Sequence, residues 1–276
     1  MVSSQRDCEV NIVIVMTTSA GSRADRQQRI AEHVLAAGSA SANELVELTG
    51  VSLMTVHRDV DDLVRRGLVR KYRGGVSAQP SSAFEAHSDY RRSARLTEKN
   101  AIAEAALAMV EPGASIMLDD STSALALAAR LGEVGPLTVV TNYRPAIDLL
   151  RELPEVRLMG LGGDYSRTHD SFNGIACLEA IEAMSVDTVF VSTSAMTGSM
   201  TFHQEQEIVM IKRAMIDAAA RSVLLMDSSK APRRALHRLR PLADFDALVV
   251  DDGVPEDLRA EMREHVDLTV TSHSNL

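Results

Sequence analysis

The chain has 276 residues, of which 45% are hydrophobic and 24% charged, as in an ordinary globular protein with room for a small domain beside a larger one. Tryptophan is absent and aromatic residues make up 3%, so the core must be built mainly from aliphatic side chains. Cys8 and Cys177 lie far apart, and neither they nor the eight histidines show metal-ligand spacing. We expect free thiols in a reducing, cytoplasmic compartment, no metal ion and no cofactor.

The net charge of −9 is unevenly distributed along the chain. Residues 1–80 hold ten Lys and Arg against nine Asp and Glu, which leaves nineteen against twenty-nine in the remainder. Five of those ten basic residues fall between positions 65 and 73. A local basic patch sets the field that a phosphate backbone meets, so nucleic acid stays a candidate partner of the first part of the chain.

Residues 1–22 contain a short apolar run at positions 10–16. The run is too short to span a bilayer and marginal as the core of a signal peptide. We expect a disordered leader, or translation that starts at Met16 instead of Met1, and no membrane partner.

Residues 23–77 read as three helices followed by a hairpin. The first helix covers residues 23–37, and Ser41 begins the second, where Glu44 completes a capping box. Ser52 is suited to cap the third helix. The apolar face predicted for that third helix is Leu53, Val56, Val60, Leu63 and Val64.

The third helix also has a polar face, and a basic hairpin follows it. Met54, Thr55, Arg58 and Arg65 lie opposite the apolar residues, and Gly74-Gly75 permits a sharp reversal between two short strands. This arrangement predicts a winged helix-turn-helix that reads DNA. A three-helix module that only binds protein is the alternative, which the outward Arg58 disfavours.

The same residues resemble the N-terminal domain of the DeoR family of bacterial transcription regulators. The matching positions are Arg26 to Ile30, Glu44-Leu45, Val51-Ser52, Thr55 to Val60, Leu63, Gly67 and Arg70 to Gly75. His57 stands where the family usually has Arg. We predict that Ser52, Thr55, His57 and Arg58 enter the major groove of a double-stranded DNA operator, and that Arg70 and Arg73 hold its backbone.

Residues 78–96 lack a steady apolar period and are expected to form a linker, with Arg91, Arg92 and Arg95 on a solvated surface. From Thr97, expected to cap a helix over residues 98–110, short apolar strands alternate with helices through residues 97–276. The strands are predicted at residues 115–118, 137–140, 156–159, 188–191, 223–226 and 248–250, and further helices at 124–131, 145–153 and 207–219. The pattern predicts an α/β domain with a parallel sheet covered on both faces.

Small polar residues follow most of these strands, at the edge where open α/β sheets bind ligands. Ser/Thr hydroxyls at the start of a helix suit a phosphate, whereas Asp119 and Asp227 suit sugar hydroxyls and Lys230 can neutralise charge. The predicted pocket, for a phosphorylated sugar or polyol, consists of Asp119, Ser121, Thr122, Ser123, Thr141, Asn142, Gly162, Gly163, Asp227 and Lys230.

These loops resemble the effector domain of the DeoR family, whose fold is related to ribose-5-phosphate isomerase and glucosamine-6-phosphate deaminase. The matching pieces include Glu98-Lys99, Leu118-Asp119, Val140 to Asn142, Lys212 to Ile216 and Asp227 to Lys230. Asp120 and Ser121 depart from the family's usual S-G-T-T loop, adding a carboxylate and bulk. The resemblance covers residues 23 to about 252.

Two classes of function compete. An isomerase or deaminase needs a poised carboxylate, for which Asp119, Glu205 and Asp227 are candidates, although structural roles explain each of them. A recognition helix beside a basic hairpin favours a regulator and not an enzyme. The resemblance implies a repressor of carbohydrate metabolism genes, relieved by a small phosphorylated sugar; operator symmetry favours a homodimer or higher homo-oligomer.

Overall fold

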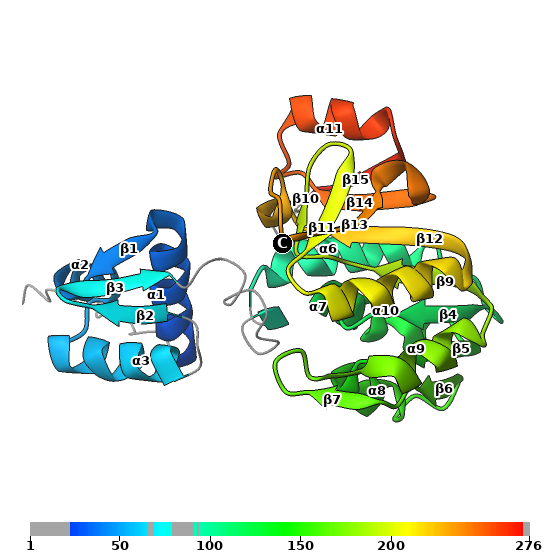
Figure 1. Ribbon diagram of the computed structural model, residues 1–276, viewed down its shortest axis with the longest axis horizontal. Helices are drawn as coiled ribbons and strands as arrows, with labels where there is room; N and C mark the ends of the chain where they lie inside the picture. Colours follow the sequence, from blue (N-terminus) through cyan, green and yellow to red (C-terminus); the bar gives the residue numbers. More distant parts are fainter. Residues whose placement is uncertain (1–22, 66–68, 79–90, 93, 273–276) are drawn as a thin grey trace, which may run out of the picture. The chain divides into compact units, whose positions relative to one another are not determined.

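The computed structural model describes residues 23–65, 69–78, 91–92 and 94–272. The leader expected at residues 1–22, Gly67 and most of the expected linker lie outside these residues. The chain divides into two compact units, Met1–Ala78 and Gln79–Leu276 (Figure 1).

The first unit packs three helices against a small antiparallel sheet. Its elements are α1 (Arg23–Ala37), β1 (Ser39–Ser41), α2 (Ala42–Thr49), α3 (Leu53–Arg65), β2 (Val69–Tyr72) and β3 (Gly75–Ala78). The capping box is present, with Glu44 N donating to Ser41 Oγ at 3.2 Å and Ser41 N to Glu44 Oε2 at 2.6 Å. The sheet order β1-β3-β2 adds a strand, β1, that the sequence analysis missed because it has only three residues.

The predicted inner face of α3 is confirmed except at its two ends, since Val64 at the far end is only partly buried. Val56, Val60 and Leu63 are buried in the core, but Leu53 is 45% exposed. A residue in the first turn of a helix reaches the core only if a neighbouring element covers that end. Leu53 therefore shares the outer surface of α3 with Met54, which is 64% exposed.

The second unit is built on a seven-stranded parallel sheet of order β15-β14-β12-β9-β4-β5-β6. The strands are β4 (Ser115–Leu118), β5 (Leu137–Thr141), β6 (Val156–Gly160), β9 (Val186–Val191), β12 (Ala219–Met226), β14 (Ala247–Asp251) and β15 (Asp267–Thr271). All six predicted strands are present, and β15 at the edge was missed. Two smaller sheets are antiparallel. In one, β7 (Asp164–Ser166) pairs with β8 (Ser171–Asn173). In the other, β11 (Met200–His203) lies between β10 (Ala195–Met196) and β13 (His237–Pro241).

Helices cover both faces of the sheet (Figure 1). On one face α6 (Leu96–Leu107), α7 (Thr122–Ala128) and α8 (Arg144–Leu150) pack against side chains such as Ile116 and Leu118. On the other, α9 (Gly174–Glu182), α10 (Gln206–Asp217) and α11 (Glu256–Arg263) pack against Met117 and its neighbours. Strands buried on both faces explain the nearly continuous apolar runs in the sequence.

The start of α6 differs from the prediction. The helix begins at Leu96, and Thr97 lies inside it instead of capping it. The N-cap residue is Arg95, whose φ of 55° is left-handed and whose side chain makes no capping hydrogen bond. Arg95 instead pairs with Glu98 at 2.8 Å, which places a carboxylate in the first turn.

Candidate functional site

The site in the second unit lies where the order of strands reverses. After β4 the chain builds β5 and β6 on one side, and then β9 on the other side of β4. Connections that leave two neighbouring parallel strands in opposite directions open a crevice at their carboxyl ends. Residues 119–122 follow β4 and residues 192–193 follow β9, so the predicted polar cluster stands at this crevice.

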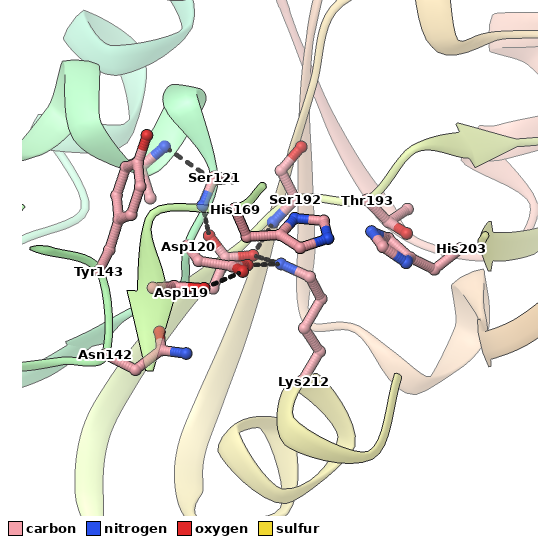
Figure 2. A network of polar contacts seen from close by, with 12 residues as sticks. Asp119, Asp120, Ser121, Asn142, Tyr143, His169, Ser192, Thr193, His203 and Lys212 are labelled. Atoms are coloured by element: carbon pink, nitrogen blue, oxygen red, sulfur yellow. Dashed lines mark hydrogen bonds and ion pairs between the residues drawn. The ribbon is translucent and has the colours of Figure 1, made fainter. Parts of the chain in front are cut away.

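Asp119 joins three elements of the site (Figure 2). Its carboxylate accepts hydrogen bonds from Ser121 N at 3.0 Å, Ser192 N at 2.7 Å and Lys212 Nζ at 2.5 Å. Asp119 is fully buried, and these donors come from the loops after β4 and β9 and from α10. The contacts give Asp119 a structural role, and its contact with an effector remains a prediction.

Asp120 places a second carboxylate on the same lysine. Lys212 Nζ donates to Asp120 Oδ1 at 2.9 Å, and Ser171 Oγ donates to Asp120 Oδ2 at 3.0 Å. Burial alone lowers the pKa of Lys212, but the carboxylates of Asp119 and Asp120 outweigh it and raise that pKa. Burial likewise opposes ionisation of Asp120, whose pKa the ammonium nevertheless holds below its ordinary value. Two carboxylates around one ammonium leave these three residues with one net negative charge.

Two histidines border this network (Figure 2). His169 Nε2 lies 2.8 Å from Glu205 Oε1, and that hydrogen bond lowers the pKa of Glu205 despite its partial burial. Glu205 N donates to His203 Nδ1 at 3.1 Å. Burial, together with the charge of Lys212, lowers the pKa of His203 to about 3, so its ring is neutral near neutral pH. The network thus combines one buried cation with a neutral imidazole.

The predicted phosphate-binding start of α7 is already occupied by the chain itself. Ser121 is the N-cap, its Oγ accepts from Ala124 N at 3.0 Å, and its own N–H is taken by Asp119. Thr122 and Ser123 lie buried in the first turn. With two N–H groups used internally, the expected phosphate geometry is not available at Ser121 in this conformation.

The remaining predicted residues lie after neighbouring strands. Thr141 Oγ1 accepts from Tyr143 N at 3.1 Å, and Asn142 Nδ2 donates to Phe172 O at 2.8 Å. Asn142 therefore reaches strand β8, which also carries Ser171.

Gly162 and Gly163 follow the edge strand β6. A Cβ on Gly163 would stand 2.2 Å from Asn173 O, and its φ is 142°. A close approach to β8 accounts for this glycine.

Asp227 and Lys230 follow β12. Asp227 Oδ1 accepts from Ser229 N at 3.1 Å and caps the short helix Ser228–Lys230. β9 lies between β12 and β4, so this pair stands one strand away from the Asp119 network.

Several residues of the site were not predicted: His169, Ser171, Asn173, His203 and Lys212 as a partner of Asp119. One signal was present, because Lys212 interrupts an otherwise apolar face of α10. The expectation that Arg91 is solvated is wrong, since its Nε and Nη2 are buried. Arg92 lies 3.7 Å from Asp170 Oδ2 and is only partly exposed.

The candidate DNA-contacting residues of the first unit are mostly open to solvent. Ser52, His57, Arg58, Arg70 and Arg73 are exposed, and Thr55 is partly buried. Thr55 N donates to Ser52 Oγ at 3.4 Å, which supports Ser52 as the cap of α3. Arg70 Nε donates to Ser77 Oγ across the hairpin at 3.1 Å.

Asp59, in contrast, is buried and binds Arg26 Nε at 2.6 Å. This ion pair fastens α3 to α1 and leaves the outer face of α3 to the residues named above.

Family models match both units. Residues 26–82 match the DeoR-like helix-turn-helix domain, and residues 94–252 match the DeoR C terminal sensor domain. The chain belongs to the DeoR family. Its members are transcriptional regulators, so this protein is a regulator and not an enzyme.

Similar proteins include the HTH-type transcriptional regulator YgbI of Escherichia coli, 32% identical over 90% of this chain and 98% of the relative. The glycerol-3-phosphate regulon repressor of Haemophilus influenzae is 33% identical over 87% and 93%. The L-fucose operon activator of the same species is 28% identical over 89% and 98%. Among solved structures, ribose 5-phosphate isomerase A from Neisseria gonorrhoeae aligns at 14% identity over 51% of this chain and 54% of that chain, with a TM-score of 0.36.

No helix in the described ranges is long and apolar enough to cross a membrane. In the same ranges, no group of three or more His, Cys, Asp or Glu side chains could hold a metal ion.

Proposed function

We propose that the protein is a repressor that binds operator DNA through α3 and the β2–β3 hairpin, and that a small phosphorylated sugar or related metabolite releases it. The buried polar network at the strand reversal, in a chain whose other unit exposes a recognition helix, carries this proposal. The network combines hydroxyls, amides and a lysine, which is the chemistry that recognises polyols. Acting on chromosomal DNA, the regulator works in the cytoplasm.

The proposed DNA interface follows from the exposed side of the first unit. Arg58 and His57 point away from the core of α3, where a major groove can admit them. Arg70 and Arg73 on the hairpin meet the phosphate backbone. A homodimer or larger assembly reads repeated or palindromic half-sites.

Asp120 narrows the class of effector. Its carboxylate leaves the Asp119–Asp120–Lys212 group with a net negative charge, which repels an anion placed directly on it. The hydroxyl groups of the effector therefore lie nearest this group, and its anionic group lies further along the crevice. A ligand with both parts, a polyol with an anionic end, satisfies both demands.

Binding to DNA from the protein's own upstream region, at fixed salt, tests the proposal. Sequence-selective binding that one sugar phosphate relieves is the expected result, and selective binding that no compound relieves would refute the effector assignment. Absence of selective binding would refute the whole proposal. In vitro transcription from the same DNA then distinguishes a repressor from an activator. Activator is the role stated in the name of one relative, the L-fucose operon activator.

A further inference from the structure

Arg91 and its neighbours are fastened to the site of the second unit. Lys99, on α6, donates through Nζ to Arg91 O and to Ala94 O, the latter at 2.5 Å. Burial lowers the pKa of Lys99 to about 8, against the pull of Asp227. Arg92 lies 3.7 Å from Asp170, which also binds Arg144. Residues 91–95 directly precede α6, and the chain before them leads to the DNA-binding unit.

Two nitrogens of the partly buried Arg91 side chain, Nε and Nη2, are shielded from solvent, and neither has a hydrogen-bond partner among the described residues. These two nitrogens form one edge of the planar group, the edge that holds two oxygens of a carboxylate or phosphate side by side. A buried charged donor without an acceptor costs free energy, so an anion that reaches this edge is favoured.

The charge of Arg91 is felt by residues of the network. It lowers the pKa of Asp120 and contributes to the low pKa values of His203 and Lys99. Arg92 contacts Asp170, the residue before Ser171, and Ser171 binds Asp120, so Arg91 lies near the strand reversal where Asp120 stands. Arg91 thus offers a positive charge where the Asp119–Asp120–Lys212 group does not.

Unpaired acceptors lie around the same aspartate. Asn173 Nδ2 donates to Ser171 Oγ at 3.2 Å, and Ser171 in turn donates to Asp120. Asn173 Oδ1 and Asn142 Oδ1 are buried and have no hydrogen-bond partner within the part of the chain that the structure describes. These oxygens need donors, which hydroxyl groups supply, whereas Arg91 needs an acceptor.

We infer that Arg91 binds the anionic group of the effector through Nε and Nη2 while Asn142 and Asn173 accept hydrogen bonds from its hydroxyls. The inference rests on the proposed function and adds which side chains bind the effector and how its binding affects the chain that leads to the DNA-binding unit. Because these atoms are shielded from solvent, the side chains around them, that of Arg91 included, must move to admit an effector. Effector binding thereby changes the position of the segment that continues into the DNA-binding unit, and the change is limited by the difference in affinity between the two arrangements.

The test measures operator affinity of the full-length protein with and without each of six compounds. Ribose 5-phosphate and glucose 6-phosphate carry a phosphate, ribonate and gluconate carry a carboxylate, and ribose and glucose are uncharged. We expect at least one anionic compound, and neither sugar, to weaken operator binding by wild type. For each protein, the operator affinity without the compound is divided by the operator affinity with it. In Arg91→Gln this ratio falls by at least about tenfold, toward one. Arg91→Lys, which keeps the charge and loses the paired donors, gives an intermediate ratio.

Arg151→Gln is the matched control, because it removes an exposed arginine paired only with Glu152 among its described contacts; it keeps the wild-type ratio. The identity of the active compound decides between phosphate and carboxylate. A wild-type response that Arg91→Gln retains in full overturns the inference while the proposed function stands. A response to the uncharged sugars alone overturns the inference and also the anionic effector of the proposed function, whereas its operator binding stands. The inference is also overturned if the wild-type protein binds its operator but none of the anionic compounds weakens that binding. Failure of wild type to select any operator refutes the proposed function instead.

Discussion

Arg58 is the residue of α3 on which sequence preference depends most in our proposal. It is exposed on the outer face beside His57, whereas Asp59 on the inner side pairs with Arg26. We expect Arg58→Ala to weaken operator binding by about 1–3 kcal/mol and to relax preference at one base pair, as the loss of a bidentate contact to guanine does. Competition between operator and unrelated DNA measures this. An equal loss on both DNAs would show that Arg58 touches phosphate only.

His203 makes the stability of the sensor unit depend on pH. Burial lowers its pKa from 6.5 to about 3, so between these values the unfolded chain binds a proton that the folded chain does not. Stability therefore falls as pH is lowered from 6.5, with a slope of up to about 1.4 kcal/mol per pH unit. We expect His203→Asn, which can keep an acceptor for Glu205 N, to be less sensitive than wild type to acid between pH 6.5 and 4.5.

Urea unfolding at several pH values measures the slope. His265→Asn, at an exposed position on the same unit, is the control and keeps the wild-type slope. Identical slopes for His203→Asn and wild type would contradict the prediction. Ordinary carboxylates titrate mostly below this window, so they do not mask the comparison.

Single residues also show where sequence reasoning succeeds. The capping box of Ser41 and Glu44 depends on neighbours three positions apart, and it is present as predicted. Arg91 depends on distant parts of the chain. Its charge acts on Asp120 and His203, which come from other elements, so a local run of arginines predicts a solvated surface although Nε and Nη2 of Arg91 are in fact buried.

At the scale of elements, α10 is fastened to the sheet by Lys212. Replacing it with Met leaves Asp119 and Asp120 buried side by side without a cation, which we expect to cost about 3–5 kcal/mol of unfolding free energy. Asp120→Asn is the matched comparison: it keeps the Lys212–Asp119 pair and costs less. Urea unfolding measures both. A Lys212→Met protein as stable as Asp120→Asn would show that the ion pairs do not hold α10.

The strands were predictable because burial on both faces requires an uninterrupted apolar run, as in residues 116–118 and 223–226. Their order was not. Nothing local in the run of β9 says that it pairs with β4 and not with β6, yet that pairing brings Ser192 to Asp119. The short antiparallel strands β10, β11 and β13 were missed for a related reason, since two to five residues carry too little pattern to distinguish a strand from a loop.

At the scale of the whole molecule, each unit has a core of its own. Buried residues of the first unit, such as Ile30 and Leu45, pack within that unit, and the two clusters on either side of the large sheet use, among the described residues, only positions from Ile102 onward. A shared core would make the units unfold together. Separate cores predict that the sensor unit folds without the DNA-binding unit.

We therefore expect a protein of residues 79–276 to unfold cooperatively, with a Tm close to that of the matching transition of the full chain, and to bind no operator. Calorimetry of both proteins tests this, with circular dichroism to confirm the α/β content of the fragment. Arg91, Lys99 and Asp120 are all retained, so the fragment also keeps the Tm increase that an active anionic compound gives the full chain. A fragment that fails to unfold cooperatively would mean that the DNA-binding unit supplies stability to the sensor. A fragment that folds but loses the compound response would place part of the effector site in residues 1–78.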